Sequence, residues 1–140
     1  MVDRELTRKK LLLLESKREE LKGFPKKNFE NFKKDLLLQK AVEKMLEELI
    51  QICIDIGKHI VSDEHLGVPD SNRGLMDILK EQKVITTSTQ ALMKKMIGFR
   101  NILVHGYEKV DVATVYISYA KKLKDFDFFL KDITKYIETK

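Results

Sequence analysis

Apolar residues recur at alternating spacings of four and three along most of this chain, which is the period of an amphipathic helix. The pattern is clearest from residue 35 to about residue 60. One apolar stripe there is formed by Leu38, Val42, Met45, Leu49, Ile52, Ile56 and Ile60, and a second by Leu46, Ile50, Cys53 and Gly57. Because this apolar arc is wide, we predict a long helix that packs against more than one neighbour.

Further helices are predicted on either side of this one. The first covers residues 6–21, and a short helix capped by Ser71 runs to residue 82. Another covers residues 90 to 104 or 105, and Asp111 caps a last helix whose apolar pattern continues to Ile137. The prediction is an all-α fold, an up-and-down bundle of four long helices plus a short one.

Length and composition agree with one globular domain over residues 1–140. The chain has 6 Gly and 2 Pro, too few for the many turns of a β-rich fold. The formal net charge of +5 permits binding to a polyanion without requiring it. A solvated, lysine-rich surface would give the same balance of charge.

The single cysteine and the N-terminus bear on the compartment. Cys53 lies in an apolar run and has no second cysteine to pair with, so we expect a buried thiol in a reducing compartment. The first residues include Asp3 and Glu5 and lack the apolar stretch of a signal peptide. No apolar run is long enough to span a bilayer. We therefore expect a cytoplasmic protein without membrane association.

The helix over residues 90–105 contains side chains that break its apolar pattern. Arg100 falls inside a stripe formed by Met93, Ile97 and Val104, and a buried arginine is costly unless it has a partner. Asn101 and His105 are four apart and share the edge of the same arc. Tyr107 would lie nearby if the helix continued. The stretch is thus expected to place a cation, an amide, an imidazole and a phenol on one side of the helix.

This set of side chains suits the cleavage of RNA. Histidine transfers protons near neutral pH, and arginine binds phosphate and stabilises charge that develops on it. RNA carries its own nucleophile, the 2′-hydroxyl, so such a site needs no metal. The sequence shows no carboxylate or Cys/His ligand cluster beside the motif, and we expect neither metal nor cofactor. A structural role at the end of a helix stays open on spacing alone.

The motif resembles that of a known family. Arg100-x4-His105-x-Tyr107 is similar to the RX4-6H signature of HEPN domains, in the RX4HXY form typical of HepT-like toxins. The whole stretch Met96-Ile-Gly-Phe-Arg-Asn-Ile-Leu-Val-His-Gly-Tyr107 reads like the core of that family. Residues 55–60 resemble its long second helix, and residues 77–79 and the last helix follow in matching order. The resemblance covers nearly the whole chain.

The resemblance implies a function and partners. The expected fold is a HEPN helical bundle that forms a homodimer, with two motifs facing each other across a cleft. The expected activity is that of a toxin in a type VII-like toxin–antitoxin system, a metal-independent endoribonuclease acting on RNA, with tRNA as one candidate. The partner would be a small nucleotidyltransferase antitoxin, which in some such systems transfers AMP to the motif tyrosine, here Tyr107.

The resemblance also implies a role for each motif residue. His105 would act as general acid or base, and Arg100 would position and stabilise the scissile phosphate. Asn101 would orient His105 or the backbone, and Tyr107 would help to hold RNA. A second reading is a dimer that binds a nucleotide, or serves as the substrate of a nucleotidyltransferase, and cleaves nothing. Outside the motif, His59 is expected to be structural, and Asp55 could pair with Arg100 across the bundle.

Overall fold

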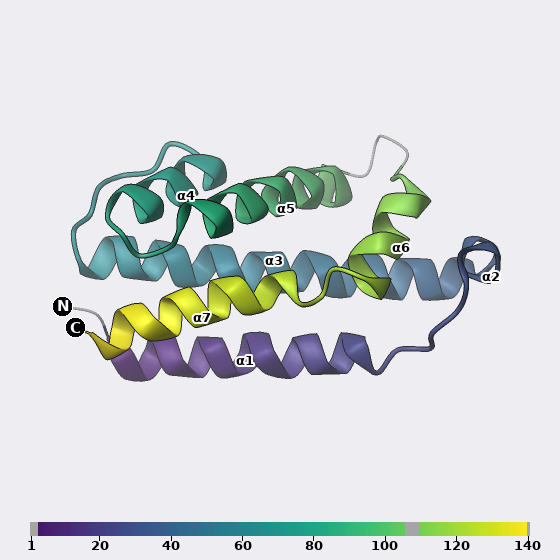
Figure 1. Cartoon of the computed structure of the whole chain (residues 1–140). Coiled ribbons are helices and arrows are strands. Elements are labelled where there is room, and N and C mark those ends of the chain that lie inside the picture. The colour runs from purple at the N-terminus through teal and green to yellow at the C-terminus, as the bar shows by residue number, and fades with distance from the viewer. Residues whose placement is uncertain (1–2, 106–109, 140) are drawn as a thin grey trace.

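The computed structural model describes residues 3–105 and 110–139, and this part of the chain is helical without any strand (Figure 1). The helices are α1 (Arg4–Lys22), α2 (Phe29–Lys34), α3 (Leu36–Asp63), α4 (Asn72–Glu81), α5 (Thr87–His105), α6 (Val112–Ala120) and α7 (Asp125–Glu138). The predicted all-α, up-and-down bundle is confirmed. None of the described helices is long and apolar enough to cross a membrane.

Helix α3 is the axis around which the others pack. Helix α1 runs along it on one side, α4 and α5 lie on another, and α2 and α6 cover the remaining end (Figure 1). Consecutive residues from Leu49 to Ile50 and from Ile52 to Ile54 are all buried, so α3 contacts neighbours around most of its circumference. This confirms the prediction drawn from its wide apolar arc. Burial also raises the pKa of the Cys53 thiol, as expected for a structural cysteine.

Short polar side chains begin the helices where the sequence predicts. The Ser71 hydroxyl accepts a hydrogen bond from the backbone N–H of Gly74 at 2.9 Å and begins α4. The Asp111 carboxylate accepts one from the N–H of Ala113 at 3.2 Å and begins α6. Thr86 caps α5 by accepting from the N–H of Thr89 at 3.1 Å. The last of these starts α5 at Thr87, slightly before the predicted residue 90.

The last predicted helix is in fact two helices, and that part of the prediction is wrong. Helix α6 ends at Ala120, tight turns cover residues 121–124, and α7 starts at Asp125. The two helices pack on different partners, since α6 contacts α2 and α3 whereas α7 contacts α1 and α5 (Figure 1). Leu123 in the bend is itself buried. The apolar spacing therefore runs through the break without revealing it.

Aromatic side chains fix α6 against α2. Tyr116 packs against the rings of Phe29 and Phe32 at centroid distances of 5.5 Å and 5.3 Å. The Tyr116 hydroxyl donates to the Lys27 carbonyl at 2.8 Å, and the Tyr119 hydroxyl donates to the carbonyl of Pro25. These contacts hold α6 against α2 and the segment before it, at the far end of the bundle.

Candidate active site

Helix α5 turns Arg100 toward α3. Ile97 and Met93, one and two turns earlier, are fully buried against the core, so the stripe predicted to contain Arg100 does face inward. Val104 is 42% exposed and leaves the core as α5 approaches its end. Arg100 is half-buried between these positions. Its guanidinium donates from Nη2 to Oε1 of Gln51 on α3 at 2.5 Å.

Gln51 connects Arg100 to Asp55. The Nε2 of Gln51 donates to Oδ1 of Asp55, one turn further along α3, at 2.8 Å. The contact between Arg100 and Asp55 that the sequence left open is therefore indirect. The group that touches the guanidinium is a neutral amide, and no salt bridge among the described residues involves Arg100. Within the part of the chain that the structure describes, its charge is therefore not neutralised by an ion pair.

The guanidinium also retains capacity to bind. Its Nε is buried and has no hydrogen-bond partner within the described part of the chain. Its Nη1 lies 3.5 Å from Oδ1 of Asn101, at the outer limit of a hydrogen bond. A buried N–H donor without a partner is unfavourable. Because Nε is closed off from solvent, an anion could reach the guanidinium only through its other nitrogens.

His105 lies apart from Arg100. It is the last residue of α5, it is exposed, and its side chain forms no hydrogen bond or ion pair with any described residue. Five residues separate it from Arg100, which corresponds to about 140° around a helix. No described contact joins the two side chains, and the expectation that both act on one side of α5 stays a prediction; Arg100 Nη1 itself lies 3.5 Å from Asn101 Oδ1. Asn101 and His105 share a face, while Arg100 points toward α3.

The remaining motif position, Tyr107, lies outside the described residues, as does Gly106. The two other histidines are structural or peripheral. His59 lies with its Nε2 3.1 Å from the Asp63 carboxylate, one turn away on α3, in agreement with a structural role. His65 is exposed in the loop after α3. Among the described residues, no three His, Cys, Asp or Glu side chains are grouped as a metal ion requires.

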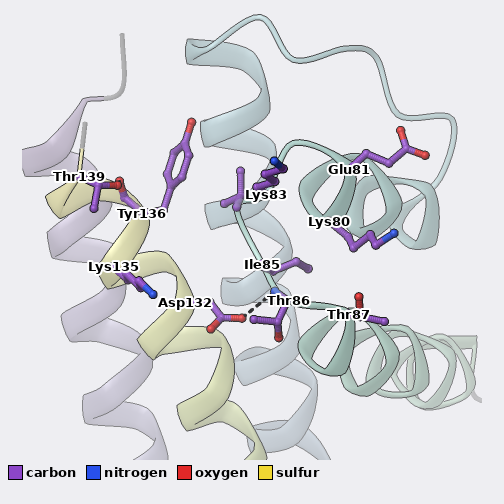
Figure 2. A pocket seen from close by; sticks show the side chains of 11 residues that line it. Lys80, Glu81, Lys83, Ile85, Thr86, Thr87, Asp132, Lys135, Tyr136 and Thr139 are labelled. Atoms are coloured by element: carbon purple, nitrogen blue, oxygen red, sulfur yellow. Dashed lines mark hydrogen bonds between the residues drawn. The ribbon is translucent and has the colours of Figure 1, made fainter.

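A hollow lies beside the start of α5, at the end opposite to the motif (Figure 2). It has a volume of about 530 Å³, and its lining includes Lys80, Lys83, Lys135 and Asp132. The Asp132 carboxylate accepts a hydrogen bond from the backbone N–H of Thr86 at 3.0 Å. An anionic side chain thus already occupies the start of the helix, where an anionic ligand would otherwise bind. Its lining mixes both signs of charge.

Sequence reasoning missed Gln51. The signal was present, because Gln51 and Asp55 are polar residues four apart within the otherwise apolar run from Leu49 to Ile56. Two polar side chains on one edge of a core helix indicate a buried polar partner elsewhere in the fold. The spacing could not reveal that this partner is Arg100, since the two helices are far apart in sequence.

Comparison with known proteins shows the family of the chain. A model of the HepT-like ribonuclease family matches residues 14–133. The chain is 36% identical to the mRNA nuclease HepT of Shewanella oneidensis over 104 residues, 74% of this chain and 77% of that protein. It is 28% identical to the tRNA nuclease HepT of Aphanizomenon flos-aquae over 118 residues, 81% and 80% of the two chains.

Solved structures share the fold. One is the tri-AMPylated HEPN toxin of Shewanella oneidensis in complex with its MNT antitoxin, with a TM-score of 0.82, 30% identity, and coverage of 96% of this chain and 99% of that one. Another is the cytosolic protein YutE of Bacillus subtilis, with a TM-score of 0.83, 25% identity, and coverage of 99% and 92%. The helical bundle and its Arg-x4-His helix thus define a HEPN protein. More narrowly, the chain belongs to the HepT-like ribonuclease family.

Proposed function

We propose that this protein is the toxin of a toxin–antitoxin pair and cleaves RNA without a metal ion. Arg100 binds the scissile phosphate, and His105 transfers a proton. The observation that carries this assignment is the way Arg100 is held. Gln51 fixes the guanidinium at 2.5 Å without neutralising it, and Nε is left buried without a partner among the described residues. A fixed, uncompensated guanidinium is suited to a phosphate whose charge grows in the transition state.

The proposed reaction is an internal transesterification. The RNA 2′-oxygen forms a bond to phosphorus, and the bond from phosphorus to the 5′-oxygen of the next nucleotide breaks. A base takes the proton of the 2′-hydroxyl, and an acid gives a proton to the departing 5′-oxygen. The products are a 2′,3′-cyclic phosphate and a 5′-hydroxyl. His105, exposed at the end of α5, is the side chain that we assign to one of these two proton transfers.

A homodimer would bring two such sites together. Ile102 and Val104 flank His105 on α5 and are 44% and 42% exposed, and Ile117 on α6 is 39% exposed. Exposed apolar side chains on α5 and α6 favour association with a second copy. The divergence of Arg100 and His105 within one chain also favours this arrangement. In a symmetric pair, the His105 of one copy can approach the phosphate that Arg100 of the other binds.

We further propose that a nucleotidyltransferase antitoxin controls the toxin by transferring AMP to Tyr107. The similar toxin of Shewanella oneidensis is AMPylated and bound to an MNT antitoxin, and a toxin–antitoxin structure with AMP-PNP is similar at a TM-score of 0.82. Each AMP would add an anionic phosphodiester and a bulky nucleoside beside His105. Such a group would compete with RNA for Arg100. We place this system in the cytosol, where YutE is found.

The test is RNA cleavage in the presence of EDTA. Purified protein, shown by mass to carry no AMP, is incubated with total RNA and with tRNA. We expect cleavage by the unmodified protein and none by His105→Ala. His65→Ala is the matched control, because His65 is also exposed and lies in a loop away from the motif. Absence of cleavage by the unmodified protein would favour the non-catalytic nucleotidyltransferase partner instead.

A further inference from the structure

Arg73 of α4 reaches across the surface of the motif helix. Its Nε donates to the carbonyl oxygen of Lys94 at 3.4 Å, a weak contact with the α5 backbone. Its Nη2 lies against Gly98, so close that a Cβ atom on residue 98 would stand 2.7 Å from it. The guanidinium therefore rests on the backbone of α5, and the glycine leaves the space that it occupies.

The side of α5 that Arg73 touches is the side that carries Asn101 and His105. Residues 94, 98, 101 and 105 follow one another at spacings of four, three and four. These positions fall within an arc of about 60° around the helix. From residue 98 to residue 105 the helix rises about 10 Å. Arg73 thus lies on the face of His105, a short distance along the helix axis.

The charge of Arg73 is available on this face. The side chain is exposed, and no salt bridge among the described residues includes it. The carboxylate of Asp77, one turn further along α4, is engaged elsewhere. It accepts hydrogen bonds from Lys94 Nζ at 2.9 Å and from Gln90 Nε2 at 2.7 Å. Asp77 therefore compensates Lys94 and leaves the Arg73 guanidinium facing solvent.

We propose that Arg73 binds an RNA backbone phosphate next to the scissile one, and that Gly98 is required to seat it there. This inference rests on the proposed ribonuclease function and adds a substrate contact from outside the motif. A guanidinium binds phosphate through two parallel N–H donors, provided that it is held in a fixed place. The backbone of α5 provides that place. The strand would then follow the face of α5 from Arg73 to His105.

The first test measures binding of a fluorescently labelled single-stranded RNA to the His105→Ala protein, in which cleavage cannot intervene. Adding Arg73→Ala should weaken binding roughly three- to tenfold and reduce the dependence of log affinity on log salt by about one unit. Arg8→Ala is the matched control, because Arg8 is an exposed arginine on α1. It should leave both quantities nearly unchanged.

The second test uses Gly98→Ala, which should displace the guanidinium without removing it. We expect a loss of affinity close to that of Arg73→Ala. The double variant should bind no more weakly than Arg73→Ala alone, since both changes act through one contact. Circular dichroism and thermal unfolding verify that both variants fold. In the active protein, Arg73→Ala should raise KM more than it lowers kcat.

The outcomes separate this inference from the proposed function. Suppose that the unmutated protein cleaves RNA, and that adding Arg73→Ala to the His105→Ala protein changes neither the affinity for RNA nor its salt dependence. The role of Arg73 is then refuted and the ribonuclease assignment stands. If Gly98→Ala and Arg73→Ala lose affinity additively, the seating of Arg73 by Gly98 is refuted. If the unmutated protein does not cleave RNA and the His105→Ala protein does not bind it, both the proposed function and this inference fail.

Discussion

The two ends of α5 differ in whether their polar groups have a charged partner among the described residues. At its start, the backbone N–H of Thr86 is matched by the carboxylate of Asp132 at 3.0 Å. At its end, Arg100 contacts only the neutral amide of Gln51 among the described acceptors on other helices, and His105 is exposed. Matched charges at a helix start stabilise the fold. We propose that Arg100, which no described carboxylate pairs with, serves in binding or reaction rather than in stability.

The largest expected effect comes from removing the unmatched cation. Arg100→Leu should lower kcat/KM for RNA cleavage by about 10²- to 10³-fold, because the developing charge on the phosphate loses its donor. The free energy of unfolding should stay the same or rise, since a leucine suits the stripe formed by Met93 and Ile97. Cleavage assays and urea unfolding measure the two effects. A variant that is both inactive and strongly destabilised would make Arg100 a structural residue.

A smaller effect is expected from giving Arg100 a charged partner. Gln51→Glu keeps the shape of the side chain but places a carboxylate against the guanidinium. We expect kcat/KM to fall roughly 10- to 100-fold, because the phosphate would then compete with an internal ion pair. Glu48→Gln, a change in charge elsewhere on α3 at a residue that pairs with Lys17, is the control and should retain activity. Full activity of Gln51→Glu would show that compensation of the charge is irrelevant.

A change at the start of α5 should alter the stability of the protein and not its activity. Asp132→Ala removes the acceptor for the Thr86 N–H and should cost about 1 kcal/mol in the free energy of unfolding. Catalytic parameters per folded molecule should not change, because α5 separates this end from the motif. Chemical denaturation and cleavage kinetics on the same preparation test this. A selective loss of kcat would instead connect the two ends functionally.

The smallest effect concerns pH. Hydrogen bonds from Lys94 and then Gln90 hold the pKa of Asp77 below its ordinary value of 3.8. A carboxyl group whose pKa is lowered in the folded state stabilises the protein when the pH is above the ordinary pKa. This contribution is lost as the pH falls through the folded-state pKa. Asp77→Asn should therefore be slightly less stable than the parent at neutral pH. The difference should vanish once the pH falls below the folded-state pKa of Asp77. A difference that persists in acid would assign the effect to packing.

Periodicity predicted most of the fold but not its bends. The apolar stripes of α3 and α5 were readable because each packs on a continuous core along its length. The break between α6 and α7 was not, since Tyr119, Leu123 and Phe126 are all buried and keep the helical spacing across it. The direction of a helix after a turn depends on which neighbours it packs against. Local spacing does not contain that information.

The sequence identified the unusual residue of the site but not the contacts that this residue makes. An arginine within an apolar stripe identified Arg100, because such a residue requires a partner. Its partner Gln51 lies on another helix and could not be assigned from spacing. The spacing of five sets the backbone positions of Arg100 and His105 about 140° apart around α5, and how the two side chains meet a substrate stays a prediction.

The most direct measurement is the chemistry of the RNA ends produced by the unmodified protein in EDTA, determined by mass spectrometry. Attack by the 2′-hydroxyl predicts a 2′,3′-cyclic phosphate, or the 3′-phosphate formed from it, together with a 5′-hydroxyl. Those ends, absent with Arg100→Leu, would support the account of an uncompensated guanidinium acting on the RNA's own nucleophile. Fragments with a 3′-hydroxyl and a 5′-phosphate would contradict it, because water and not the RNA would then be the nucleophile.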